Sequence, residues 1–497
     1  MKKLVFAAVL ASGICALPVL AIELGAPFSD GMVLQRGRRV PVWGEGTPGS
    51  EIWVSFDEVS AVAIVDTNGY WRVDLPALDT SAVGRILTVV ERSGGQTIDI
   101  VHIVDVLVGE VWFASGQSNM ECPIWGSDGR YRDGKGGLMT RITRLDRLRF
   151  VKTPRAWSVV PKKLKATWQT FEPKNFKTDN QLSAIAFYYA RELYLALGVP
   201  IGIIDCSWGG TNIDAWTPRE AYADCPDVLR PTADYPVRLD FEADRDKRGP
   251  IYGPNQQPTV LWNGMVRAYA PMAVRGMIWY QGCCNASPEE SPLYCAKMHL
   301  LYKGWSEAFE NPDLRLYFVQ LAPYRQNWNA IVAQQNQFAA EEKNAAIVVT
   351  ADIGNFDDIH PNDKETIAKR LLAQALVRDY GLTGFDPDSP VFRAMRVEED
   401  MVFLSFEHAE GWYVYSKDRS LTPPFELAGT NGEWHAAMIL NVQDKYKRGP
   451  FEGREIVLRS ETVSHPVSVR YMGRPRTAGT LYNENSLPLG AFEASVR

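Results

Sequence analysis

Four short apolar runs in the middle of the chain constrain the fold more than any other feature. Apolar runs of this length, separated by segments with helical spacing, are typical of a parallel sheet in an α/β domain. In such a sheet, active sites lie at the edge where the strands end. The runs occupy residues 201–205, 275–280, 314–319 and 346–350, and helical patterns cover 182–197 and 364–380.

A serine follows another apolar segment at a strand end of this kind. The segment starts at Gly109 and reaches Gly116-Gln117, and Ser118 comes next. A serine on a sharp turn at the sheet edge becomes a nucleophile if a base reaches it. The Gly-x-Ser-x-Gly elbow of α/β-hydrolases is absent, so this motif alone is weak evidence, since most serines in such turns are structural.

One histidine stands out as the base. His360 follows Asp357 and Asp358 on a segment between an expected strand and an expected helix. An acid within a turn of a histidine can orient its ring and stabilise the imidazolium. The local sequence alone slightly favours the alternative, a turn-capping aspartate beside a surface histidine. The six histidines form no His-x-His or His-Glu-x-x-His cluster, so we expect no catalytic metal, and no cofactor is implied.

Two further strand ends carry residues that suit an oxyanion pocket. Gly209-Gly210 follows the run at 201–205, and Gln281 and Asn285 follow the run at 275–280. Glycine allows close backbone approach, and backbone N–H groups and side-chain amides can bind developing negative charge. Each segment alone is equally well explained as an ordinary β-turn.

The flanks of this central region have β-type patterns. Residues 22–108 alternate short strands and turns, with an Asn68-Gly69 hairpin signal, as in a small antiparallel β-sandwich. Alternating apolar segments return after about residue 384. We therefore expect an N-terminal β domain over 22–108, a catalytic α/β domain over 109–385 and a C-terminal β domain over 386–497.

The first 21 residues have the pattern of a secretory signal. Lys2 and Lys3 precede an apolar stretch that ends near Ala21, a small residue at a cleavage position. A retained membrane anchor is the less favoured alternative. We expect a mature chain that is periplasmic or secreted and has no stable membrane insertion. The formal net charge of −6 and the lack of a long basic run argue against nucleic-acid binding.

Six cysteines lie beyond this segment, several of them beside the motifs above. An oxidising compartment permits disulfides between them, although the spacing of the cysteines does not give their pairing. Buried free thiols are expected equally. The six are Cys122, Cys206, Cys225, Cys283, Cys284 and Cys295.

These motifs together resemble the sialate O-acetylesterase family, within the wider serine esterases called SGNH hydrolases. The similarity is nearly full length and keeps the order of the motifs. It implies an SGNH-hydrolase-like three-layer α/β domain with a parallel sheet, flanked by β-sandwich-like domains. The matching segments are residues 109–120, 209–216, 279–282 and 358–364 in the centre, 30–36 near the start, and 466–471, 481–483 and 487–488 near the end.

The resemblance implies a serine carboxylic ester hydrolase. Ser118 would attack the acetyl carbonyl after His360 takes its proton, and an acetyl-enzyme would form. The N–H groups of Ser118 and Gly210, with the Gln281 amide, would bind the oxyanion, and Asn285 is a further candidate. Related esterases place the acid three residues before the histidine, which favours Asp357, whereas the Asp-Ile-His-Pro motif favours Asp358; we prefer Asp357.

The implied substrate is an O-acetylated sugar, with sialic acid first. Acetylated xyloglucan or xylan is the alternative within the esterases, and a non-catalytic carbohydrate-binding protein is the alternative from another class. The chain departs from the family at Cys283-Cys284, where Glu-Ser is usual. This change could alter hydrogen bonding behind the oxyanion donors. A bond from this pair to Cys122, Cys206 or Cys295 is expected rather than one between the adjacent cysteines.

Overall fold

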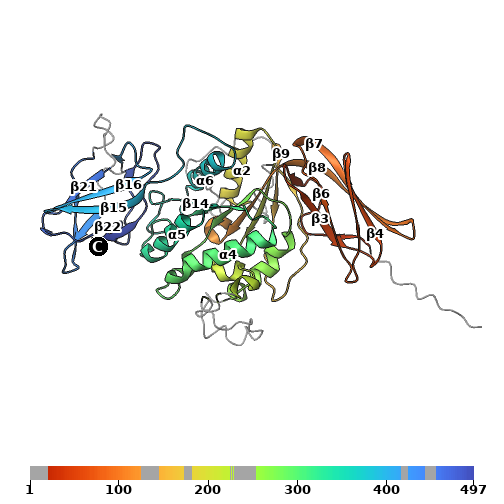
Figure 1. The fold of residues 1–497 in the computed structure, drawn as a ribbon, viewed down its shortest axis with the longest axis horizontal. Helices are drawn as coiled ribbons and strands as arrows, with labels where there is room; N and C mark the ends of the chain where they lie inside the picture. Colours follow the sequence, from red (N-terminus) through yellow and green to blue (C-terminus); the bar gives the residue numbers. More distant parts are fainter. Residues whose placement is uncertain are drawn as a thin grey trace, which may run out of the picture.

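The fold is described from a computed structural model of the chain. The structure describes residues 21–124, 145–172, 182–223, 225, 228, 253–415, 424–442 and 455–496. The expected secretory signal therefore lies almost wholly outside the described residues. The chain is a mixed α/β protein with several sheets (Figure 1).

A central sheet carries the strand ends that the sequence singled out. Its order is β10-β9-β11-β8-β12-β13-β14, and it is parallel from β9 to β14. The four predicted apolar runs correspond to β11, β12, β13 and β14. The strands are β8 (Gln96–Gly116), β9 (Leu145–Lys152), β10 (Gln169–Phe171), β11 (Ile201–Ser207), β12 (Gly276–Tyr280), β13 (Arg315–Val319) and β14 (Ala345–Val348).

The order of these strands reverses at β8. Strands β9, β10 and β11 lie on one side of β8, and strands β12, β13 and β14 lie on the other. Open α/β sheets bind ligands at such a switch point, just beyond the carboxyl ends of the strands. The end of β8 is therefore the place where this sheet favours an active site.

Helices cover both faces of the central sheet. α2 (Ala184–Leu197) and α6 (Lys364–Arg378) pack together on one face, and α4 (Tyr294–Ala308) and α5 (Asn329–Glu341) pack together on the other (Figure 1). Every residue of β11 and β12 is buried, which explains their continuous apolar pattern. Shorter helical elements are α1 (Ser118–Glu121), η3 (Ile213–Trp216), η4 (Arg219–Tyr222), η6 (Pro254–Gln256), η7 (Trp262–Val266), η8 (Arg267–Tyr269), η9 (Cys283–Asn285) and η10 (Ser291–Leu293).

The N-terminal β strands are joined to the central sheet through β8 itself. The first part of β8 pairs with β7 and β2, and residues 110–116 pair with β11 and β12. The expected domain boundary at residues 108–109 thus falls inside one strand. The other N-terminal strands are β1 (Glu23–Leu24), β2 (Val33–Gln35), β3 (Val40–Glu45), β4 (Glu51–Phe56), β5 (Val59–Ile64), β6 (Tyr70–Leu75) and β7 (Ser81–Ser93).

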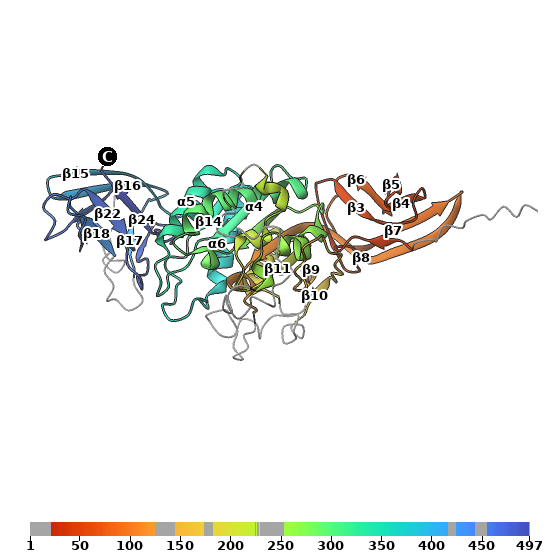
Figure 2. The same ribbon diagram turned by 90° about the horizontal axis from the view of Figure 1, so that it is seen from below.

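The C-terminal β strands lie at the opposite end of the molecule from the N-terminal ones (Figures 1 and 2). They form sheets β15-β16-β21-β20, β19-β18-β22-β24 and β17-β23 around a separate apolar core. Within the described ranges, no helix has both the length and the apolar character needed to cross a bilayer. The strands are β15 (Val391–Glu398), β16 (Met401–Glu407), β17 (Tyr413–Val414), β18 (Phe425–Ala428), β19 (Trp434–Ala436), β20 (Met438–Ile439), β21 (Glu455–Arg459), β22 (Ser468–Tyr471), β23 (Leu481–Tyr482) and β24 (Phe492–Ser495).

Candidate active site

Ser118 lies at the switch point of the central sheet, directly after β8. Gly116 ends the strand with a φ of 139°, and a Cβ there would collide with the carbonyl group of Tyr280. Only glycine fits both this conformation and this approach. Ser118 is the first residue of α1, so its N–H has no partner within the helix and is available to a ligand.

His360 reaches Ser118 from the loop that follows β14. Its Nε2 lies 2.9 Å from the Ser118 Oγ, although 242 residues separate the two along the chain. The imidazole is 37% exposed, so this pair is open to solvent on one side. A serine hydroxyl within hydrogen-bond distance of an imidazole has the geometry of a nucleophile and its base.

Asn119 connects the short helix of Ser118 to the loop of His360. Its Nδ2 donates to the carbonyl of Ile359 at 3.0 Å, and its Oδ1 accepts from the buried Lys364 ammonium at 2.6 Å. Both contacts cross from α1 to the segment around His360. Sequence reasoning included Asn119 and Lys364 in the matched motifs but gave them no role.

Of the two candidate acids, Asp358 lies next to His360. Its Oδ1 is 3.4 Å from the His360 Nδ1 and also accepts the backbone N–H of His360 at 2.9 Å. Asp357 is instead 80% exposed and pairs with Arg476 at 3.0 Å. The preference for Asp357 thus disagrees with the structure, because the turn at Asp358 directs that carboxylate, and not its neighbour, to the ring.

The Gly209-Gly210 segment lies against Ser118. A Cβ on Gly209 would be 3.1 Å from the Ser118 Cβ, and the Gly209 N–H donates to Glu121 at 2.7 Å. Gly210 has a φ of 70°, and its carbonyl accepts from the Gln256 amide. Among the described residues, no hydrogen bond occupies the Gly210 N–H. This N–H is therefore available to a ligand, as is that of Ser118.

Gln281 and Asn285 are placed behind this pocket and not in it. Both are fully buried. The Gln281 Nε2 donates to the Thr211 carbonyl at 3.1 Å and to Asn285 at 2.8 Å, so both of its hydrogens are used. The Asn285 Oδ1 also accepts the N–H of Ile213 at 3.0 Å. The expectation that the Gln281 amide binds the oxyanion therefore disagrees with the structure; Gln281 and Asn285 join the segments after β11 and β12.

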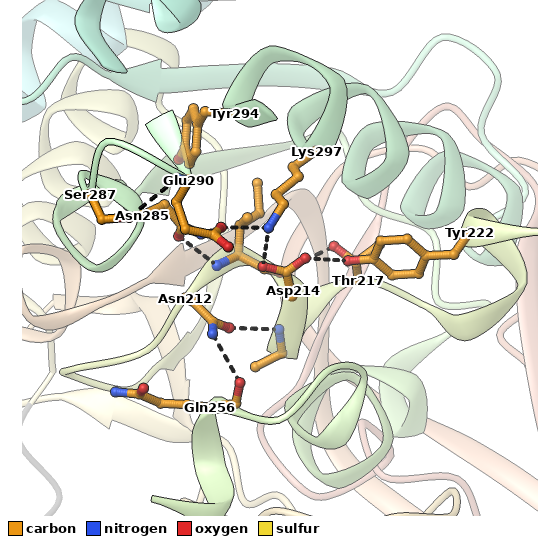
Figure 3. Close-up of polar contacts among 12 residues, drawn as sticks. Asn212, Asp214, Thr217, Tyr222, Gln256, Asn285, Ser287, Glu290, Tyr294 and Lys297 are labelled. Atoms are coloured by element: carbon orange, nitrogen blue, oxygen red, sulfur yellow. Dashed lines mark hydrogen bonds and ion pairs between the residues drawn. The ribbon is translucent and has the colours of Figure 1, made fainter. Parts of the chain in front are cut away.

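A buried ion network extends this connection (Figure 3). The fully buried Lys297 of α4 donates to Asp214 at 2.8 Å and to Glu290 at 2.6 Å, and the Asn285 Nδ2 donates to Glu290 at 3.1 Å. Burial acts to lower the pKa of Lys297, but the two carboxylates outweigh it and hold this pKa above its ordinary value. Sequence reasoning missed this network; the one signal was a lysine within the otherwise apolar face of a helix.

The cysteines beside the site are thiols. All six described cysteines are unpaired, so the expected bond from Cys283 or Cys284 to another cysteine is absent. Burial raises the pKa of the Cys283 thiol to about 12 and that of Cys284 to about 11. The side chain of Gln117 fixes this segment, because its Oε1 accepts the N–H groups of Gly282 at 3.1 Å and Cys284 at 3.4 Å.

An arginine and a tryptophan lie beside Ser118. The guanidinium of Arg155 pairs with Glu121 at 2.5 Å, and it lies 5.8 Å from the ring of Trp208. Glu121 belongs to the same short helix as Ser118, and Trp208 precedes Gly209. A cation and a partly exposed aromatic side chain therefore lie next to the segments that carry Ser118 and Gly209.

Comparison with known proteins finds carbohydrate esterases among the matches. A family model described as carbohydrate esterase, sialic acid-specific acetylesterase, matches residues 251–380. The sialate O-acetylesterase of Rattus norvegicus is 25% identical over 431 residues, covering 78% of this chain and 79% of the relative. That of Homo sapiens is 24% identical over 437 residues, covering 82% and 80%.

A solved structure is similar along nearly the whole chain. It is a carbohydrate acetylesterase from Xanthomonas citri, which is 29% identical, with a TM-score of 0.79, and the match covers 96% of this chain and 100% of the other. The resemblance inferred from the motifs is thereby confirmed. Together with the sequence relatives, this match identifies the chain as a hydrolase that acts on carboxylic esters.

Proposed function

Because the chain resembles the sialate O-acetylesterases over most of its length, we propose that it removes O-acetyl groups from sialic acid. The observation that carries the proposal is the 2.9 Å contact between the Ser118 Oγ and the His360 Nε2 at the switch point of the sheet. Two N–H groups that can bind an oxyanion lie in the same pocket. This is the set of groups that acyl transfer through a serine requires.

The proposed reaction has two halves. His360 takes the proton of Ser118 while the Oγ attacks the acetyl carbonyl, and the N–H groups of Ser118 and Gly210 stabilise the oxyanion. His360 then gives that proton to the departing sugar oxygen, which leaves an acetyl-enzyme. A water molecule, deprotonated by His360, attacks the acetyl group, and acetate leaves as Ser118 regains its proton. Asp358 orients the imidazole and stabilises its charged form.

The surroundings of Ser118 favour an acidic sugar. The Arg155 guanidinium suits a sugar carboxylate, because guanidinium groups bind carboxylates in bidentate geometry. The neighbouring Trp208 offers an apolar face to a sugar ring. Neutral acetylated xylan and xyloglucan carry no carboxylate on their main chain and would not use the arginine.

We also propose the wider arrangement that the resemblance implies. Residues 109–385 form the SGNH-type catalytic domain, and 22–108 and 386–497 form flanking β domains. The strand order around β8 and the helices on both faces of the sheet support this arrangement. Residues 1–21 act as a secretory signal and place the enzyme in the periplasm or outside the cell.

Acetate release by the purified protein tests the function. The substrates are O-acetylated sialic acid, acetylated xylan and acetylated xyloglucan, and the variants are Ser118→Ala and Ser306→Ala, the latter a half-buried serine on α4. We expect fastest release from sialic acid, and a loss of about 10³-fold or more in Ser118→Ala alone. Faster release from a plant polysaccharide would replace the proposed substrate. Unchanged release by Ser118→Ala would refute the serine mechanism and favour the carbohydrate-binding alternative.

A further inference from the structure

Three metal-ligating side chains lie together where α4 packs against α5. Cys295 and His299 are four residues apart on α4, so both side chains lie on one face of the helix, one turn apart. Glu341 is the last residue of α5 and faces them. None of the three takes part in the serine chemistry, and their spacing in the sequence gave no metal motif.

The sulfur–oxygen distance in this cluster matches that of a tetrahedral metal site, and the nitrogen–oxygen distance is somewhat shorter than in such a site. The Cys295 Sγ is 3.5 Å from the Glu341 Oε2, the His299 Nε2 is 2.9 Å from the same oxygen, and all three atoms lie within 4.8 Å of one another. A tetrahedral zinc ion with Zn–S of about 2.3 Å and Zn–N and Zn–O of about 2.0 Å separates sulfur from oxygen by about 3.5 Å and nitrogen from oxygen by about 3.3 Å.

We propose that Cys295, His299 and Glu341 bind one zinc ion, with water as the fourth ligand. A thiolate combined with an imidazole selects zinc over magnesium or calcium, which prefer oxygen ligands. The ion would connect α4 to α5 and would leave the reacting groups untouched.

Residues of α5 already orient two of the ligands. The Gln337 Nε2 donates to the Oε1 of Glu341 at 2.8 Å, and the Oε2 faces the other two ligand atoms. The ring of Phe338 packs edge-on against the His299 imidazole at 4.8 Å. Such supporting contacts are a regular part of metal sites. The side chains of His299 and Glu341 are 36% and 47% exposed, which gives an ion a path into the site.

A bridge at this point would brace the segment behind the active site. Tyr294, which precedes Cys295 on α4, donates to the Gln281 side chain at 2.8 Å. Gln335 of α5 accepts the N–H of Leu321, after β13, at 3.0 Å. An ion that binds the folded protein and not the unfolded chain raises the unfolding temperature by mass action.

Cobalt binding to the full-length protein tests the site directly. Protein dialysed against a chelator is titrated with Co²⁺, and we expect one equivalent to give the absorption bands of a tetrahedral site, including a sulfur-to-cobalt charge-transfer band. Cys295→Ser should lose that band. Cys225→Ser, which removes an exposed thiol outside the cluster, should keep it. A missing band, or a band that survives in Cys295→Ser, would overturn the proposal.

Thermal unfolding with Zn²⁺ gives a second readout. Excess Zn²⁺ should raise the Tm of the wild type and of Cys225→Ser by a few degrees, and the rise should vanish in Glu341→Gln. This change is at a partly exposed helix end, so the variant should fold, and Glu342→Gln is its matched control. An equal rise in Glu341→Gln and wild type would show that any zinc effect arises elsewhere.

Discussion

Replacing Asp358 with asparagine should lower kcat for acetate release by about 10- to 100-fold. The Asp358 Oδ1 lies 3.4 Å from the His360 Nδ1, so the carboxylate stabilises the imidazolium that forms when Ser118 loses its proton. Asparagine keeps the size of the side chain and removes its charge. The loss should appear in kcat more than in KM, because the imidazolium exists only as the reaction proceeds.

The magnitude follows from the distance and the exposure. Two unit charges 3.4 Å apart interact by about 1 kcal/mol in water and about 5 kcal/mol at an effective dielectric constant of ~20. The Asp358 side chain is 47% exposed, so solvent screens the pair and the lower half of that range applies. About 1.4–2.7 kcal/mol corresponds to the stated 10- to 100-fold loss.

Asp357→Asn is the matched control for this prediction. Asp357 is 80% exposed and pairs with Arg476, so its loss should change kcat by less than about threefold. The pH–rate profile separates charge from structure: in Asp358→Asn the acidic limb should move to lower pH, because the imidazolium has lost a stabilising charge. A larger loss in Asp357→Asn, or equal mild losses with unmoved profiles, would refute the assignment of Asp358.

Three further predictions concern groups around the site. Asn119→Ala should lower kcat about tenfold or more in steady-state kinetics and leave KM nearly unchanged, because the change releases the loop of His360 from α1. An unchanged kcat would contradict this role of Asn119. Lys297→Met should lower the free energy of unfolding in urea by about 3–5 kcal/mol, since two carboxylates lose their shared cation, whereas the exposed Lys303→Met should have little effect. Glu110 is buried, which acts to raise its pKa, but its arginine partners outweigh this and hold the pKa below its ordinary value. Its contribution to stability is therefore complete above the ordinary pKa of a glutamate and disappears as the pH falls through the lowered pKa. The Tm gap between wild type and Glu110→Gln should shrink in acid, and a constant gap would count against this.

The sequence was sufficient to predict the central strands and the meeting of Ser118 with His360. Each of the four apolar runs is a strand of the central sheet, because parallel strands covered on both faces need continuous apolar residues. Ser118 follows the strand at the switch point, and His360 follows the last strand of the same sheet. Side chains at the carboxyl ends of parallel strands lie along one edge, so their meeting follows from the topology.

The detailed roles of the polar side chains could not be predicted in the same way. Gln281 and Asn285 do follow a strand end, but their amides hydrogen-bond to Thr211 and Ile213, which lie 70 and 72 residues away in the sequence. The choice between the two aspartates depends on one turn, in which Asp358 accepts the N–H of His360. Hydrogen bonds of this kind depend on side-chain directions, which motif spacing does not contain.

Because β8 is one continuous strand, the N-terminal strands are attached to the central sheet more rigidly than the C-terminal strands are. The same strand pairs with β7 at its start and with β11 and β12 at its end, so the N-terminal strands and the support of Ser118 form one stiff ladder. The C-terminal strands follow α6 through residues 379–390, which contain no helix or strand, and they are held to the central part by hydrogen bonds such as that from the Gly479 N–H to the Ala351 carbonyl at 2.8 Å. Motion of the C-terminal strands would therefore reach the loop of His360 through the pair of Arg476 with Asp357, whereas Ser118 is held by β8.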